Sequence, residues 1–341
     1  MYRKVLLILA SVLLSCTGAA CEGAGDIASD MASDFNTMLG IEDTPSGGPS
    51  GSGSVPSGTS DPAVFASSEG NRDSTPAVLT PVHDGSETCG NEVVTIDTSD
   101  AANGYISVLY TGTNNKVKFR ITGSDGVTYT YLLTGGYDVF PLSDGSDTYT
   151  LDVYENVQGN EYIKAYTTSY TATVTNEFGA WLYPNQYVNF TEDSQVVSKA
   201  EQLAASADSD LDVLTNIYNF IIGTITYDYE KAETVVSGYV PDPDEILRLK
   251  TGICLDYASV MCCMLRSQSI PCRLEVGYVD GDAYHAWISV YLDEIGWVNG
   301  VVEFDGVSWK MMDPTFASSM KEESLRKYIG NGTNYSTKYI Y

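Results

Sequence analysis

A cysteine and a histidine in the C-terminal part of the chain, followed by an aspartate, have the residue types and the order required for nucleophilic catalysis. Cys254 follows a glycine and precedes an apolar segment, residues 255–265, that is predicted to form a helix. A cysteine at a helix N-terminus lies beside unpaired N–H groups and the positive end of the helix dipole, which favour the thiolate. Cys254 is therefore the candidate nucleophile.

His285 and Asp313 lie on segments that alternate like strands. Residues 272–278 and 284–290 are predicted to be neighbouring strands, and a third strand ends at Asp313. Neighbouring strands would place His285 beside the helix end, with Asp313 orienting its other ring nitrogen, which is the arrangement of nucleophile, base and orienting group in covalent catalysis. Taken singly, these residues also fit a core cysteine, a packing histidine and a turn aspartate. Their combination favours a site.

Five short motifs in this order resemble the core of the transglutaminase-like superfamily. They are Gly252-Ile253-Cys254-Leu255-Asp256-Tyr257-Ala258, Leu265-Arg266 with Ile270-Pro271-Cys272-Arg273, Gly277-Tyr278, His285-Ala286-Trp287 and Asp313-Pro314-Thr315. The resemblance spans about residues 190 to 330 and is densest from 250 to 316. It implies a papain-like fold in which Cys254, His285 and Asp313 are catalytic.

The resemblance also implies a reaction class but no particular substrate. A cysteine attacks an amide carbonyl of a protein or peptide and forms a thioester. Water as acceptor would make the enzyme a peptidase or amidase, and an amine would make it an acyl transferase. The alternative is a non-catalytic cell-surface adhesion or binding module that uses the β-rich region of the chain.

Other residues are assigned supporting roles. The backbone N–H of Cys254 is one candidate oxyanion donor, and Tyr227 or Tyr229 is the other. Trp287 is the candidate wall of the substrate site. The chain has seven cysteines without a CxxC pair and only two histidines, so neither a metal nor another cofactor is predicted. Cys262, Cys263 and Cys272 are expected to be buried apolar residues.

Upstream of this core, residues 87–182 read as a β-sandwich domain of the immunoglobulin-like type. Runs rich in Val, Thr, Tyr and Ile alternate with turns such as Thr122-Gly123-Ser124-Asp125-Gly126. The expected fold class is thus α+β, with an all-β immunoglobulin-like domain followed by a papain-like transglutaminase core at 183–341.

The N-terminus predicts export. Residues 1–21 combine basic residues with a short apolar run, as in a signal peptide. Leu13-Leu14-Ser15-Cys16 resembles a lipobox, so Cys16 is the candidate lipidation site; plain secretion is the alternative. Residues 22–86, rich in Ser, Gly and Pro, are predicted to be a flexible spacer.

The charge balance limits the possible partners. The chain has 45 Asp and Glu against 18 Lys and Arg, a net charge of −27, which opposes binding to nucleic acid. The expected protein is an extracellular, monomeric lipoprotein held to the membrane by its lipid anchor. Its partner is a protein or peptide substrate, with cell-wall peptide as one candidate.

Overall fold

The computed structural model describes residues 70–279, 283–293, 295–298, 302–304, 309–311 and 335–341. The described residues all belong to one compact unit. The predicted signal peptide, Cys16, most of the predicted spacer and Asp313 lie outside the described residues. Among the residues described, no helix has the length and apolar character needed to cross a membrane.

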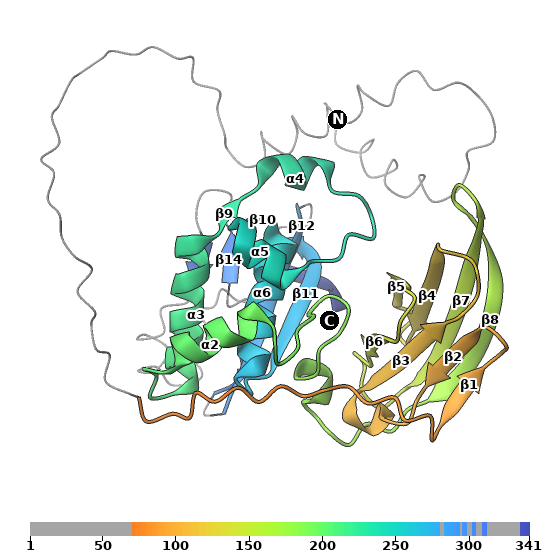
Figure 1. Ribbon diagram of the computed structural model, residues 1–341, viewed down its shortest axis with the longest axis horizontal. Helices are drawn as coiled ribbons and strands as arrows, with labels where there is room; N and C mark the ends of the chain where they lie inside the picture. The colour runs from red at the N-terminus through yellow and green to blue at the C-terminus, as the bar shows by residue number, and fades with distance from the viewer. Residues whose placement is uncertain (1–69, 280–282, 294, 299–301, 305–308, 312–334) are drawn as a thin grey trace, which may run out of the picture. The chain divides into compact units, whose positions relative to one another are not determined.

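The N-terminal part consists of two four-stranded antiparallel sheets (Figure 1). One has the order β1-β2-β3-β6, with bounds Thr88–Gly90, Val94–Asp97, Tyr105–Tyr110 and Asp138–Pro141. The other has the order β5-β4-β7-β8, with bounds Thr128–Leu132, Val117–Thr122, Thr148–Gln158 and Glu161–Thr171. Short 3-10 helices span Ala101–Asn103 and Gly179–Trp181.

Side-chain alternation explains how these two sheets enclose a core. Along β4, buried Val117, Phe119 and Ile121 alternate with partly exposed residues, the pattern of a strand with one covered face. Phe119 packs against Phe140 of β6 at 4.8 Å between ring centroids, which joins the two sheets. The predicted strands are therefore present; the immunoglobulin-like assignment of this region stays a prediction.

The C-terminal part mixes helices with antiparallel sheets. Its helices are α2 (Gln195–Ala204), α3 (Asp210–Thr224), α4 (Tyr229–Thr234), α5 (Pro243–Leu249) and α6 (Cys254–Ser267). Its main sheet has the order β13-β12-β11-β16, with bounds Gly296–Val298, Ala283–Leu292, Cys272–Val279 and Tyr335–Ile340. Two short pairs complete it: parallel β9 (Thr226–Tyr227) with β10 (Thr251–Gly252), and the hairpin of β14 (Val302–Phe304) and β15 (Trp309–Met311).

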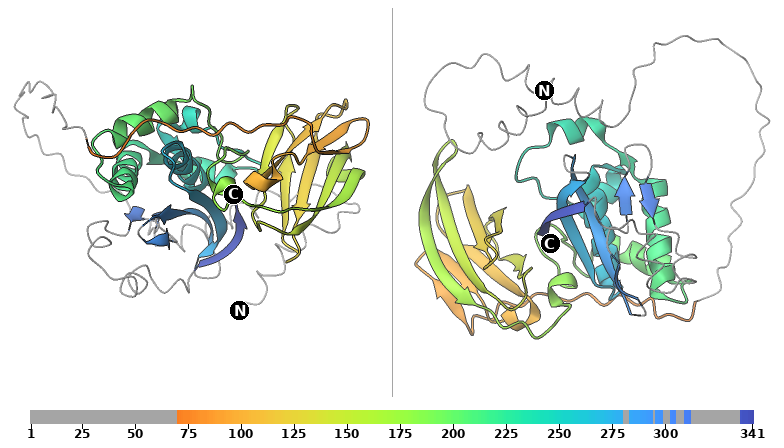
Figure 2. Two further views of the ribbon diagram at one scale, coloured as in Figure 1. Left: turned by 90° about the horizontal axis from the view of Figure 1, so that it is seen from below. Right: turned by 180° about the vertical axis from the view of Figure 1, so that it is seen from behind.

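The helix α6 is the central element of this part. It contacts α2, α3 and α5, and it also contacts β11 and β12 (Figures 1 and 2). Every residue from Asp256 to Ser267 is buried, which is the burial expected for a helix covered on all faces. Its first two residues, Cys254 and Leu255, are only partly buried, so the start of the helix lies at the edge of the core.

Residues 70–86 differ from the predicted flexible spacer. Arg72 Nε lies 2.6 Å from Asp210 Oδ1, and an Arg72 Nη2 hydrogen donates to the Gln268 carbonyl at 2.6 Å. The Ala77 N–H donates to the Ser267 carbonyl at 2.9 Å. The composition of this segment cannot build a core of its own, but its one arginine supplies donors that hold it along α3 and the end of α6. The spacer boundary placed at residue 86 is therefore too late.

Candidate active site

Cys254 occupies the first position of α6, where the sequence predicted it. Ile253 is the N-cap, with extended backbone angles, and the short strand β10 leads into it. The Asp256 carboxylate folds back and accepts a hydrogen bond from the Ile253 N–H at 2.9 Å. A Cβ added at Gly252 would lie 2.7 Å from the Asp256 Cβ, so the glycine makes room for this cap. The local sequence thus fixes where the helix begins and where the thiol is held.

The thiol of Cys254 lies against the strand that carries His285. Backbone N–H groups of Ala286 and Leu255 interact with the sulfur, and these contacts favour the thiolate. Burial acts the other way and is the larger effect, because it raises the pKa of Cys254 to about 11. Burial therefore outweighs the lowering of the thiol pKa that was expected from the helix N-terminus and favours the neutral thiol.

His285 lies on β12, directly before the residue that contacts the sulfur, and pairs in register with Gly277 of β11. Its Nε2 atom is buried and has no hydrogen-bond partner among the residues that the structure describes. Burial lowers the pKa of His285 to about 4 and so favours the neutral imidazole. Cys254 and β12 are thus brought together; Asp313, the predicted orienting residue, lies outside the described residues.

Tyr227, one of the two tyrosines predicted as a second oxyanion donor, lies beside Cys254; its role stays a prediction. On the short strand β9, Tyr227 pairs in parallel register with Gly252, which lies two residues before Cys254. The Cys254 backbone N–H forms a hydrogen bond to the Tyr227 hydroxyl, and burial raises the pKa of that phenol well above its ordinary value. A phenol that stays protonated remains a hydrogen-bond donor. Tyr229 is 44% exposed and packs edge-on against Tyr227 at 5.0 Å.

The predicted substrate wall and a residue that the sequence argument missed lie on the same strand. Trp287 is 2% exposed, so its ring packs within the protein and leaves little surface for a substrate. Tyr284 is 56% exposed and interacts electrostatically with Cys254. Its position directly before His285 was the only sequence signal that it borders the thiol.

A second missed feature is a buried charged cluster under the start of α6. Asp256 is fully buried, and its Oδ2 lies 2.5 Å from the Lys231 Nζ. The Tyr239 hydroxyl donates to Asp256 Oδ1 at 2.6 Å. Lys231 belongs to α4 and Tyr239 to the loop after it, so the cluster fastens this connection to the turn that carries Cys254. Nothing in the spacing of these residues predicted that they would meet.

The described residues contain no group of three His, Cys, Asp or Glu side chains placed to hold a metal ion.

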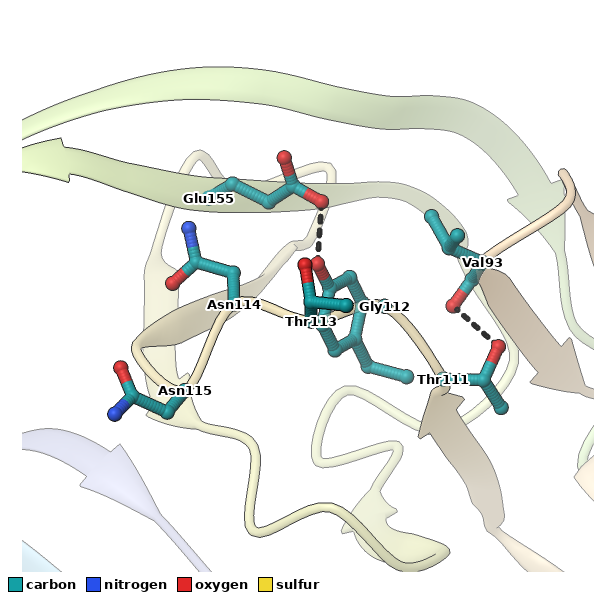
Figure 3. Close-up of a pocket in the computed structure, with 8 residues that line it drawn as sticks. Val93, Thr111, Gly112, Thr113, Asn114, Asn115 and Glu155 are labelled. Atoms are coloured by element: carbon teal, nitrogen blue, oxygen red, sulfur yellow. Dashed lines mark hydrogen bonds between the residues drawn. The ribbon is translucent and has the colours of Figure 1, made fainter.

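A polar pocket lies in the β region, beside the end of β3 (Figure 3). Tyr110 donates a hydrogen bond to Glu155 there. The remaining lining residues are Val93, Thr111, Gly112, Thr113, Asn114 and Asn115.

Comparison with known proteins identifies the region around Cys254. Residues 197–300 match the family model described as Transglutaminase-like superfamily. A UPF0252 protein of Methanocaldococcus jannaschii is 31% identical over 91 residues. That match covers 24% of this chain and 26% of the archaeal protein, so the chain spans about a quarter of that relative.

Solved structures give weaker similarities. A candidate cysteine protease from Cytophaga hutchinsonii has a TM-score of 0.34 at 12% identity, covering 75% of this chain and 73% of that one. Red sea bream transglutaminase has a TM-score of 0.26 at 13% identity, covering 62% of this chain and 48% of that one.

Proposed function

Since residues 197–300 match the transglutaminase-like superfamily, we propose that this chain is an exported cysteine enzyme acting on amide bonds of proteins or peptides. The observation that supports this most is the position of Cys254. It is the first residue of α6, and its sulfur contacts the Ala286 N–H next to His285. A structural cysteine has no need of this juxtaposition with a strand-borne imidazole.

The proposed reaction begins from neutral groups. The Cys254 sulfur attacks the amide carbonyl carbon while its proton passes to the imidazole of His285. The negative charge that develops on the carbonyl oxygen is stabilised by the Cys254 N–H and the Tyr227 hydroxyl. His285 then gives the proton to the leaving amine as the C–N bond breaks, and a thioester remains on Cys254.

Asp313 would complete this arrangement by holding the His285 ring and stabilising the imidazolium. It follows His285 in the family order, as the sequence motif Asp313-Pro314-Thr315 indicates. An adjacent carboxylate would also raise the pKa of the imidazole, opposing the lowering that burial causes. The triad therefore uses a charge on Asp313 to make His285 a competent base.

The second half of the reaction decides between hydrolysis and transfer. A glutamine-containing peptide supplied alone would release ammonia and become a glutamate peptide if water is the acceptor. Added primary amine would be incorporated if the enzyme is an acyl transferase. Cleavage of the peptide chain would identify a peptidase. A Cys254→Ala variant that retained any of these activities would exclude the proposed mechanism.

Export and anchoring are parts of the same proposal. The N-terminal signal-like run and the lipobox-like Leu13-Leu14-Ser15-Cys16 support an extracellular enzyme held at the membrane by a lipid on Cys16. We expect Cys16→Ala to leave the membrane fraction and appear in the medium. Equal membrane retention of variant and wild type would argue against lipidation at this residue.

A binding role for the β region is the second candidate function. The pocket beside Tyr110 and Glu155 favours it, because amide, hydroxyl and carboxylate groups line an accessible surface of this region. Under this alternative the core around Cys254 has no turnover, and Glu155→Ala lowers binding to the cell surface. Under the enzymatic proposal Glu155→Ala leaves turnover of a small peptide unchanged.

A further inference from the structure

Two buried cysteines face each other across the packing of α6 and β11. The sulfur atoms of Cys262 and Cys272 lie 2.9 Å apart. This separation is shorter than the contact distance of two unbonded carbon atoms, about 3.5–4.0 Å, although sulfur is the larger atom. Both residues are fully buried. The side chains therefore already point at one another in a place where no solvent or ligand separates them.

The backbone around this pair is held by contacts of its own. Arg266, four residues after Cys262 on α6, is almost fully buried. Its Nε and one Nη2 hydrogen donate to the Cys272 carbonyl at 3.0 and 2.8 Å. These bonds fix the start of β11 against the last turns of α6. Because the main chain is already in place, joining the two sulfurs requires only a small side-chain adjustment.

The other cysteines of this region are not placed to compete. Consecutive helical residues are rotated by about 100° around the axis, so Cys263 points elsewhere. Its sulfur contacts the Asn189 carbonyl at 3.7 Å. Cys254 lies about 12 Å further along the helix axis from Cys262, at 1.5 Å per residue. The geometry therefore selects a single pair.

We propose that Cys262 and Cys272 form a disulfide bond that fastens α6 to β11. The two thiols lose two protons and two electrons, and one S–S bond forms between them. A disulfide donor supplies the oxidising equivalents: its own S–S bond breaks and it leaves as two thiols. The proposal does not depend on catalysis by Cys254, only on the chain meeting such a donor while it folds.

Burial determines when the bond forms and how long it lasts. In the folded protein the Cys272 thiol is inaccessible, and burial raises its pKa above the ordinary value, so it reacts slowly. Oxidation must therefore precede the final closure of the core. The same burial then protects the finished bond from reductants, which reach it only after unfolding. Such a bond is a permanent clamp between the helix that carries Cys254 and the sheet that carries His285.

Peptide mapping of the full chain tests the pairing directly. The chain is unfolded with reductant, refolded with a mixture of reduced and oxidised glutathione, then unfolded again in the presence of iodoacetamide and digested with trypsin without reduction. Cleavage after Lys250, Arg266 and Arg273 yields peptides 251–266 and 267–273. We expect these two peptides to be joined, lighter by two hydrogen atoms than their sum, with fragmentation placing the link on Cys262. Alkylated Cys262 and Cys272, or a link through Cys254 or Cys263, would overturn the proposal.

Matched variants separate the crosslink from simple packing. Cys263→Ala removes a buried thiol at the neighbouring position and should still give the linked peptides. Cys272→Ala should not give them. Reduced wild type should melt roughly 5–10 °C below oxidised wild type, and Cys272→Ala should melt at the same temperature in both conditions. Equal melting temperatures for reduced and oxidised wild type would contradict a disulfide bond that fastens α6 to β11. If a variant does not fold, the two redox forms of the wild type still decide the matter.

Discussion

The first turn of α6 and its middle use the same residue type for different purposes. Cys254 in the first turn is partly exposed and touches the N–H of Ala286 beside His285. Cys262 in the middle is fully buried and faces only Cys272. One helix thus holds one thiol at the edge of the core, where we propose that it reacts, and another fully inside the core. Burial and neighbours, rather than residue type, decide what a cysteine can do.

The largest effect is expected when each of these two thiols is removed in turn and the activities of the two variants are compared. Cys254→Ala should abolish turnover of a glutamine peptide or an activated ester, a loss of at least about 10³-fold. Cys262→Ala, the matched variant from the same helix, should lower the melting temperature but keep kcat/KM within a few-fold in protein that is still folded. Comparable activity losses in both variants would mean that the helix, and not the Cys254 thiol, matters.

The partners of Cys254 should act as one unit with it. His285→Ala should cost about as much as Cys254→Ala, because neither the proton acceptor nor the donor to the leaving amine remains. Asp313→Ala should cost less, because the imidazole persists without its orienting group. Adding His285→Ala to Asp313→Ala should lower kcat/KM little below that of His285→Ala alone. Multiplied losses, as for independent contacts, would contradict the triad.

The pH dependence of alkylation sharpens the account of the resting thiol. The thiolate is the reactive form, and burial raises the pKa of Cys254 to about 11, so deprotonation should continue well above neutral pH. We expect the alkylation rate of Cys254 in the substrate-free enzyme to rise about tenfold per pH unit from pH 7 to 10, roughly 10³-fold in all. Mass spectrometry of peptide 251–266 measures it.

A plateau in that profile below pH 8 would have a specific meaning. It would show that Cys254 and His285 rest as a thiolate–imidazolium pair, with the charge of Asp313 overcoming the effect of burial on His285. Cys262 in the reduced protein serves as the internal control, because it is fully buried and should stay unlabelled at every pH at which the protein remains folded.

A smaller effect is expected at the oxyanion position. Tyr227→Phe removes the hydroxyl that lies at the Cys254 N–H and should lower kcat about 10²-fold, with little change in KM. Tyr229→Phe is the matched control, since this residue is largely exposed, and should change kcat less than twofold. A larger loss of kcat in Tyr229→Phe than in Tyr227→Phe would make Tyr229, and not Tyr227, the oxyanion donor.

The smallest expected effect concerns the support under the first turn of α6. Lys231→Met leaves the buried Asp256 carboxylate without its cation and should lower the free energy of unfolding by about 2 kcal/mol, allowing for the partial exposure of Lys231. Arg248→Met breaks the exposed pair with Glu245 and should cost clearly less, because solvent screens the charges of this pair. Chemical denaturation compares the two. Equal losses of unfolding free energy in the two variants would show that the buried Lys231–Asp256 pair stabilises the fold no more than an exposed pair does.

The sequence predicted the parts of this region that depend on local pattern. Gly252 followed by Cys254 and an apolar run placed the start of α6 correctly, because caps and helical periodicity are local properties. The strand pair that carries His285 was also predicted, since alternation is visible in the sequence. The immunoglobulin-like assignment rests on the strand pattern of residues 87–182, and the triad rests on residue order together with the family resemblance; both remain predictions.

Features that arise from packing could not be predicted in this way. The pairing of Cys262 with Cys272 depends on which helix face meets β11, and the meeting of Lys231, Tyr239 and Asp256 depends on the path of the loop after α4. The effect of burial on the thiol could not be predicted for the same reason: the helix N-terminus is visible in the sequence, but the burial that raises the pKa of Cys254 is not. Likewise, composition alone gave no sign that Arg72 holds residues 70–86 against the core.

The most direct test of the account is the capture of the acyl-enzyme. The full chain is mixed with an activated ester or a glutamine peptide, quenched in acid within the first turnovers, and analysed by mass spectrometry after digestion. We predict an acyl group attached to Cys254 in peptide 251–266, released by hydroxylamine and absent from Cys254→Ala. Turnover without any adduct on Cys254, or an adduct that persists in Cys254→Ala, would contradict the assignment of Cys254 as the nucleophile.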